Sequence, residues 1–221
     1  MKFRLLKYLS PVLQPVYRQY LSRTRPFRYK DIHILVRPGV FFPGLTFSTG
    51  LLLNFIETLD LHGKTLLELG AGSGILSLSA ASKGAIVTAS EINHVAVQNI
   101  SENALMNHIP VTVIESDLFK ELLPEVFDFI LINPPYYPQD PVNYDEMAWF
   151  CGRNFEYFDK LFQQLPAFYS DSTQILMILS EDCNIAAIKD IGVRHGFSFS
   201  LLQKTRKLGE WNYIFQILKV S

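Results

Sequence analysis

Three carboxylates and a glycine-rich segment stand at the ends of apolar runs, where main chain and side chains can meet a ligand. Residues 68–74 read Glu68-Leu69-Gly70-Ala71-Gly72-Ser73-Gly74, between the apolar run 65–69 and a helical pattern. Glycines at this spacing let the backbone turn tightly and let a ligand approach the main chain. A carboxylate just before a helix N-terminus attracts a cation such as an amino group. The segment predicts a ligand site, although a tight turn alone would also use glycines.

The other two carboxylates close the next two apolar runs. Glu91, followed by Ile92, stands 21 residues after Gly70, where a carboxylate typically accepts hydrogen bonds from both hydroxyls of a ribose. Asp117, followed by Leu118, ends the third run, and an acceptor there can bind the amino group of an adenine. Chance rarely places three carboxylates at the ends of three neighbouring strands. The set therefore predicts a nucleoside-binding edge.

The most specific pattern is the run Asn133-Pro134-Pro135-Tyr136 at the end of the fourth apolar segment. Two prolines cannot continue a central strand, so the chain must leave the sheet there. The Asn133 side-chain oxygen and the Pro134 carbonyl can both accept hydrogen bonds from one NH2 group. The Tyr136 ring can form a flat wall beside a planar substrate. The alternative is a proline-rich turn without chemistry.

These residues need a sheet that brings the strand ends to one edge. Strands are expected at 65–69, 85–90, 111–116, 127–133 and 173–180, with helices at 75–83, 93–107, 153–167 and 184–194. This alternation predicts a parallel sheet with helices on both faces. Two last strands, 197–203 and 211–220, are joined by a short turn and must pair antiparallel. The expected fold is α/β, with a seven-stranded sheet and a C-terminal antiparallel hairpin.

The N-terminal part has a different character. Residues 1–30 read as helical with interrupting prolines, 31–37 as a strand, and 50–60 as an apolar helix after a Gly/Pro loop. We expect a basic helix-and-strand extension over 1–45 and a main domain over 46–221. The first 30 residues hold eight Lys/Arg and no acid, whereas the rest holds 12 basic and 21 acidic residues. Such an arm attracts phosphate-rich partners or docks on the acidic remainder.

Composition excludes several classes of protein. The chain has 221 residues, 48% hydrophobic and 19% charged, which excludes a disordered or collagen-like polymer. Its two cysteines, Cys151 and Cys183, form no C-x-x-C pair, and its five histidines show no metal spacing, so we expect no metal site. No apolar run reaches the roughly 18 residues that a membrane helix needs. We expect a cytoplasmic protein that does not bind membranes.

In order and spacing, these motifs resemble those of the class I S-adenosylmethionine-dependent methyltransferases. The resemblance spans roughly residues 43–220 and implies a Rossmann-like sheet with S-adenosylmethionine as cofactor. The resemblance implies that the cofactor is bound by the following residues: Thr49, Glu68, Leu69, Gly70, Ala71, Gly72, Gly74, Glu91, Ile92, Asp117, Leu118 and Asn133. It also implies that the catalytic residues are Asn133, Pro134, Pro135 and Tyr136.

The Asn-Pro-Pro-Tyr form is typical of methyltransferases that act on planar nitrogens, namely glutamine amides, adenine N6 and guanine N2. More narrowly, the chain is similar to the short HemK-like glutamine methyltransferases of translation release factors. Thr49, before an apolar helix, and the stretch Ala148-Trp149 with Gly152-Arg153-Asn154 carry this likeness. Residues 43–48 lack the usual acidic residues, and the basic residues 1–30 differ from the usual helical domain. Both departures lie where a substrate would meet the enzyme.

The expected reaction is displacement of the sulfonium methyl group by a substrate nitrogen. Asn133 and the Pro134 carbonyl would hold its two N–H bonds, which favours lone-pair character on nitrogen. A protein glutamine, of the release-factor type, is the favoured acceptor; adenine or guanine in rRNA or tRNA, docked through residues 1–30, is the alternative. A nicotinamide-dependent oxidoreductase fits poorly, because the spacing is G-x-G-x-G rather than G-x-G-x-x-G. A non-catalytic subunit that binds the cofactor beside a partner chain is a further alternative.

Overall fold

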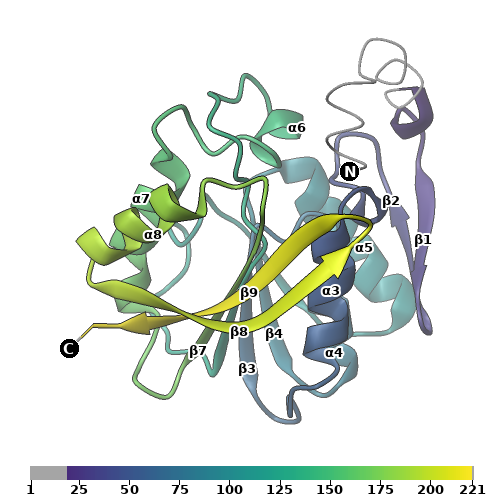
Figure 1. The fold of residues 1–221 in the computed structure, drawn as a ribbon. Helices are drawn as coiled ribbons and strands as arrows, with labels where there is room; N and C mark the ends of the chain where they lie inside the picture. Colours follow the sequence, from purple (N-terminus) through teal and green to yellow (C-terminus); the bar gives the residue numbers. More distant parts are fainter. Residues whose placement is uncertain (1–18, 221) are drawn as a thin grey trace.

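A single seven-stranded sheet forms the centre of the protein, whose structure, a computed structural model, describes residues 19–220 (Figure 1). Its strands are β3 (Thr65–Leu69), β4 (Ile86–Glu91), β5 (Thr112–Glu115), β6 (Phe129–Ile132), β7 (Gln174–Ser180), β8 (Phe197–Lys207) and β9 (Glu210–Lys219). They lie in the order β5-β4-β3-β6-β7-β9-β8, parallel from β5 to β7 and antiparallel at β9 and β8. The predicted α/β fold, with its seven strands and C-terminal hairpin, is confirmed.

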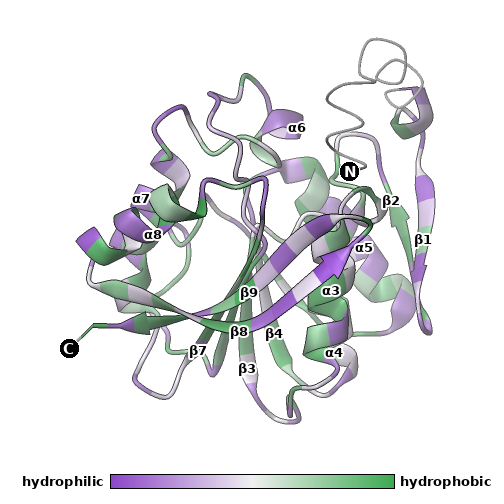
Figure 2. Cartoon of the chain, in the orientation of Figure 1, coloured by the Kyte–Doolittle hydropathy of each residue, from purple (hydrophilic) through white to green (hydrophobic). Residues whose placement is uncertain are grey.

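Helices cover both faces of the sheet. They are α3 (Phe47–Ile56), α4 (Ile75–Ser82), α5 (His94–Asn107), α6 (Tyr144–Met147), α7 (Glu156–Gln164) and α8 (Ile185–Arg194), with single 3-10 turns η1 (Pro43–Leu45) and η2 (Leu165–Ala167). One apolar cluster joins the sheet to α3 and α4, and a second joins its other face to α7 and α8. Figure 2 shows the hydrophobic residues concentrated on the central strands and on the helices that pack against them. The buried strand β6 is apolar throughout because it is covered on both sides.

A separate two-stranded hairpin precedes the main sheet. Strand β1 (Arg25–Tyr29) pairs antiparallel with β2 (Ile32–Val36), and Phe27 lies opposite Ile34. The expectation of a helix up to residue 30 is therefore wrong for residues 25–29. Alternate burial explains the difference: Phe27 and Tyr29 pack against the core while Pro26 and Arg28 face outward. Residues 1–18 of that expected helical segment lie outside the described residues.

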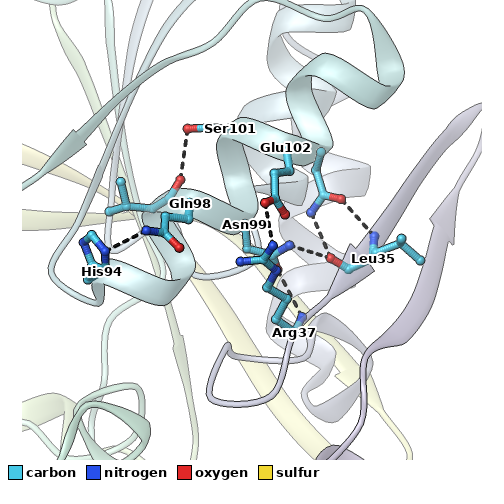
Figure 3. A network of polar contacts seen from close by, with 9 residues as sticks. Leu35, Arg37, His94, Gln98, Asn99, Ser101 and Glu102 are labelled. Atoms are coloured by element: carbon cyan, nitrogen blue, oxygen red, sulfur yellow. Dashed lines mark hydrogen bonds and ion pairs between the residues drawn. The ribbon is translucent and has the colours of Figure 1, made fainter.

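Asparagines from α5 fasten this hairpin to the main domain. Asn107 bonds both the N–H and the carbonyl of His33, and Asn103 bonds both groups of Leu35. Asn99 accepts from the N–H of Arg37 at 3.2 Å and donates to the carbonyl of Leu35 at 2.8 Å. Figure 3 shows Asn99 beside Leu35 and Arg37, with Glu102 paired to the Arg37 side chain. We call these three residues the asparagine ladder; it pairs the outer edge of β2, which would otherwise be open.

Two details of the elements affect the site. Helix α3 begins at Phe47, so Thr49 lies in its first turn rather than before it. Helix α7 covers only the middle of the stretch expected at 153–167, because Phe155 adopts a left-handed conformation before it and a 3-10 turn containing Pro166 follows it. Within residues 19–220, no helix has the length and apolar character needed to span a membrane.

Candidate active site

The direction of strand succession changes between β3 and β6, and the candidate site lies at this change. From β3 the chain proceeds outward through β4 and β5, and it then returns to β6 on the other side of β3. In open α/β sheets, ligands bind outside the carboxyl ends of the strands at such a switch point. The glycine segment, Glu91 and Asp117 follow β3, β4 and β5 on one side. Asn133 follows β6 on the other side, so one edge carries all the motifs.

The glycine segment forms the turn between β3 and α4. Gly70, Gly72 and Gly74 all have left-handed φ angles, of 68°, 55° and 75°. A side chain at Gly74 would also overlap Ile100 of α5, at 2.8 Å, so both backbone and packing require glycine there. A Cβ at Gly70 would meet no atom of the described residues within 4 Å, so among these residues space is open beside the main chain. The turn thus leaves a backbone surface that a ligand can approach.

Glu68 lies beneath this turn. Its side chain is 2% exposed and accepts a hydrogen bond from Ser77 of α4. Burial raises the pKa of the Glu68 carboxyl to about 8, the Ser77 hydrogen bonds oppose the shift, and nearby Glu91 adds to it. In this geometry Glu68 fastens the turn to α4. Direct contact between Glu68 and a cationic amino group stays a prediction.

Glu91 ends β4 and organises the site from within. Its two oxygens accept from the N–H of Gly72 at 2.7 Å and from the N–H of Asn93 at 2.9 Å. Burial raises the pKa of this carboxyl, whereas its backbone hydrogen bonds lower it. Ile92, between them, is half-buried. Glu91 therefore links the glycine turn to the first turn of α5.

Asp117 lies in a tight bend after β5. Leu118, the next residue, has a φ of 57°, and its carbonyl accepts from the hydroxyls of Ser90 and Ser116. The Asp117 carboxylate forms an ion pair with Lys160 of α7, in which both side chains are 40% exposed. An adenine amino group at Asp117 would therefore compete with Lys160. Sequence analysis missed Lys160, because nothing in the pattern of α7 links it to β5.

The loop after β6 is tied down by a second segment. The N–H groups of Tyr136 and Tyr137 both donate to the carbonyl of Trp149, and the N–H of Cys151 donates to the carbonyl of Tyr137. Asn133 stays partly exposed at the start of this loop. Pro134 is buried, and Pro135 and Tyr136 are half-buried. The stretch that follows the catalytic motif in sequence thus supports that motif in space.

Buried hydroxyls without partners mark both sides of the site. The Thr49 hydroxyl in α3 and the Tyr157 hydroxyl in α7 are buried and find no hydrogen-bond partner within residues 19–220. Tyr157 lies close enough to Glu91 and Asp117 for their charges to raise its pKa further, after burial has raised it most. Buried polar groups are normally paired, so such orphans indicate a place for a ligand. Together with the open space at Gly70, they fit a polar ligand at this edge.

Comparisons with known proteins agree with this site. Residues 31–151 match the family described as methyltransferase small domain. A Methanocaldococcus jannaschii protein with the provisional name protein N5-glutamine methyltransferase is 32% identical over 175 residues, 75% of this chain and 86% of the relative. The tRNA1(Val) (adenine(37)-N6)-methyltransferase of Shewanella loihica is 35% identical over 128 residues, 52% of this chain and 50% of the relative. A methyltransferase crystal structure from Pyrococcus furiosus shares the fold, with a TM-score of 0.66 and 19% identity over 94% of this chain and 98% of that chain.

Fold and comparisons together make the protein a class I S-adenosylmethionine-dependent methyltransferase. The chain belongs to the methyltransferase small domain family. The predicted enzyme class and the predicted cofactor, S-adenosylmethionine, are confirmed. Both named relatives are nitrogen methyltransferases by name, in agreement with the predicted N-methyltransferase, and both are named for macromolecular substrates.

Proposed function

We propose that the protein transfers a methyl group from S-adenosylmethionine to the side-chain amide nitrogen of a protein glutamine, as an enzyme of the short HemK-like, release-factor type. The observation that carries the proposal is the Asn-Pro-Pro-Tyr loop, which begins at the end of β6 next to the strand that bears the glycine turn. The Methanocaldococcus jannaschii relative supports the glutamine acceptor, since the match spans 86% of its length.

In this proposal the loop holds the acceptor and leaves the nitrogen free to react. Bound S-adenosylmethionine would supply a methyl group on a positively charged sulfur: as the N–CH3 bond forms, the S–CH3 bond breaks, the neutral thioether leaves with the electron pair, and the proton displaced from nitrogen passes to water. The Asn133 side-chain oxygen and the Pro134 carbonyl accept hydrogen bonds from the two N–H groups of the substrate amide. These contacts stabilise the positive charge that develops on its nitrogen. The Tyr136 ring lies along the planar amide. Burial raises the pKa of Tyr136 well above its ordinary value, so its hydroxyl stays neutral.

The other side of the switch point would hold the cofactor. Glu91 is assigned to the ribose hydroxyls, Asp117 to the adenine amino group, and Thr49 to the amino-acid end of the cofactor. The backbone of residues 68–74, with Ile92 and Leu118, completes the set. We propose residues 46–221 as the catalytic domain and residues 1–45 as an extension that meets the substrate.

The test is methyl transfer from radiolabelled S-adenosylmethionine to purified release factor, with Asn133→Ala as the matched inactive variant. Label on the release factor at a single glutamine, located by mass spectrometry, supports the proposal. Label that persists with Asn133→Ala contradicts the role of the loop. An unlabelled release factor, with label on tRNA or rRNA in a parallel reaction, contradicts the acceptor.

One feature favours an RNA acceptor as the second candidate. Strand β8 carries no acidic residue, and exposed Lys204 and Arg206 lie over the Trp211 ring at 4.4 Å and 5.5 Å from its centroid. The amino group of Lys204 also lies 5.5 Å from the centroid of Tyr213. Basic and aromatic side chains on one ribbon are typical of surfaces that bind phosphates and bases. The β8–β9 hairpin would add its positive charge to that of the basic residues 1–30 in attracting RNA.

Charge reversal separates the two candidates. With an RNA acceptor, Lys204→Glu combined with Arg206→Glu should lower kcat/KM about tenfold or more, and added salt should weaken the wild-type reaction steeply. With a glutamine acceptor, the same double variant should change release-factor methylation by less than about threefold. Steady-state transfer to both substrates at low and high salt measures the difference.

A further inference from the structure

The most exceptional polar side chain in the described structure is Asn212 of β9. It is 2% exposed, and both its amide nitrogen and its carbonyl oxygen are buried without a hydrogen-bond partner within residues 19–220. A carboxamide offers two donors and an acceptor, so burial with neither end paired is rare in folded proteins. Position therefore decides whether Asn212 is a packing defect or part of a site.

Strand register places Asn212 at the site edge. Asn212 pairs directly with Ser180, the last residue of β7, so the two side chains share one face of the sheet about 5 Å apart. Two residues further along β9, Ile214 packs in the cluster beneath α3. Asn212 therefore lies on the α3 side of the sheet, nearer the edge that carries the motifs.

Ser180 connects Asn212 to the Asn-Pro-Pro-Tyr loop. The Ser180 side chain lies close enough to the Tyr136 hydroxyl and to the Glu210 carboxyl to lower the pKa of each, although burial raises both more strongly. The hairpin tip closes on the same region, since the Lys207 amino group lies 5.4 Å from the centre of the Phe47 ring in the first turn of α3. The loop after β6, the end of β7 and the start of β9 thus form one continuous edge.

We propose that Asn212 is the third contact of the acceptor amide: its Nδ2 donates to the carbonyl oxygen of the glutamine whose N–H bonds Asn133 and Pro134 hold. This inference rests on the proposed glutamine acceptor. It explains why both ends of the Asn212 side chain lack partners among residues 19–220. The Asn212 oxygen is left to accept from an N–H of the same substrate chain.

A donor at that position serves the chemistry. A neutral carboxamide reacts with alkylating agents more readily at oxygen than at nitrogen, because nitrogen shares its lone pair with the carbonyl group. Two acceptors on the N–H bonds and one donor on the oxygen fix the plane of the amide. The face of the nitrogen is then presented to the methyl group while the oxygen is occupied. Asn212 would thus fix the orientation of the substrate amide and direct methylation to its nitrogen rather than to its oxygen.

The test is a set of three variants, of which Asn212→Leu should lose activity without losing stability. Asn212→Leu keeps the number and branching of the side-chain heavy atoms and removes an unpaired polar group, so the melting temperature should stay equal or rise while kcat/KM for release factor falls about 100-fold or more. Asn212→Asp keeps the shape and removes the donor, and it should lose activity likewise. Gln216→Ala, on the same strand, is the control and should change kcat/KM by less than about twofold. Binding of S-adenosylmethionine, measured by calorimetry, should stay within about twofold for all three.

The outcomes separate this inference from the proposed function. If wild type labels release factor and Asn212→Leu retains activity within threefold, the inference is overturned and the function stands. If Asn212→Leu melts at a lower temperature and loses cofactor binding together with activity, Asn212 is structural and the inference is again overturned. If wild type labels only RNA, the function and the inference fall together. Loss of release-factor methylation with unchanged melting and unchanged cofactor binding supports both.

Discussion

Buried asparagines occur in two regions of this protein that differ in how completely their amide groups are hydrogen-bonded. The asparagine ladder on α5 and the single Asn212 on β9 both contain side chains that are almost fully buried, with Asn99 1% exposed and Asn103 and Asn212 2%. In the ladder, every amide oxygen accepts from a backbone N–H and every amide nitrogen donates to a backbone carbonyl. In Asn212, neither end has a hydrogen-bond partner in the part of the chain that the structure describes. Burial of a polar group therefore does not reveal function here; the completeness of its pairing does.

Physical chemistry explains the contrast. A buried donor or acceptor without a partner destabilises a fold by about 1–3 kcal/mol, so such groups persist where something outside the fold completes them. Within residues 19–220, the orphaned side chains are Thr49, Tyr157, Tyr169 and Asn212. Thr49, Tyr157 and Asn212 come from three different elements around one edge of the sheet, whereas Tyr169 precedes β7 at the opposite edge and has no place in the site. The ladder side chains, by contrast, are paired at both ends and hold the β1–β2 hairpin in place.

The largest effect should come from the reactive loop, which is built for a substrate rather than for the fold. Asn133→Ala should lower kcat by about 10²–10³, because one of two contacts to the reacting NH2 group is lost. Its melting temperature should change by no more than about 2 °C, since Asn133 is partly exposed. Single-turnover transfer and thermal denaturation measure the two quantities. A large loss of stability would place Asn133 with the ladder instead.

Breaking the ladder should give the converse result. Asn103→Leu leaves both backbone groups of Leu35 with fewer partners and should lower the free energy of unfolding by about 2–3 kcal/mol. The kcat of the folded enzyme, assayed well below its melting temperature, should change less than about twofold. Ser101→Ala on the exposed side of α5 is the matched control, with an expected change below about 0.5 kcal/mol. Urea denaturation decides; equal values for the two variants would contradict the ladder's structural role.

Glu68 lies between these extremes, because its carboxyl has a partner in Ser77 yet remains costly to ionise. Its folded pKa of about 8 lies above the ordinary value of 4.5, so its contribution to stability is full below pH 4.5 and is lost as pH rises through 8. Between pH 6 and pH 7.5 the wild type should lose about 2 kcal/mol relative to Glu68→Gln. Chemical denaturation at the two pH values measures this difference. Parallel pH profiles would show that Glu68 is ionised in the folded protein.

The smallest effect should come from the ion pair at the edge of the site. Lys160→Met frees Asp117 and should tighten S-adenosylmethionine binding by about two- to fivefold, in keeping with the small net strength of an exposed ion pair. Lys120→Met removes the partner of Glu121 and serves as control, with no change in affinity expected. Calorimetric titration compares the three proteins. Weaker binding by Lys160→Met would show that Lys160 orients Asp117 for the cofactor rather than competing with it.

The sequence predicts the sheet well because local signals and topology agree. Apolar runs alternate with helical patterns from residue 64 onward, and the observed strands and helices of the main sheet follow them. The motif residues could be expected at one edge, since the carboxyl ends of parallel strands meet there. Residues 25–29 form a strand where the sequence predicts a helix, because this strand depends on pairing with β2 rather than on its own propensity.

The missed residues share a cause. Lys160 reaches Asp117 from 43 positions further along the chain, and Asn212 meets Ser180 only through the antiparallel register of β7 and β9. Neither has a spacing that marks it in the sequence. A signal did exist for the ladder, since asparagines at 99, 103 and 107 share one helix face. Without the hairpin, however, that face reads as an ordinary solvated surface.

The asparagine ladder also joins two elements with different rises per residue, the helix α5 and the strand β2. Four helical residues advance about 6.0 Å and two strand residues about 6.6 Å, so the two scales drift by about 1.2 Å over the span from Asn107 to Asn99. The hydrogen bonds show this drift: Asn107 and Asn103 each bond a single residue of the hairpin, whereas Asn99 bonds both Arg37 and the carbonyl of Leu35. A fourth asparagine, one helical turn further along α5, would be displaced too far from the matching residue of the strand to bond it. The mismatch therefore limits the ladder to about one short strand and allows the hairpin only one alignment along α5.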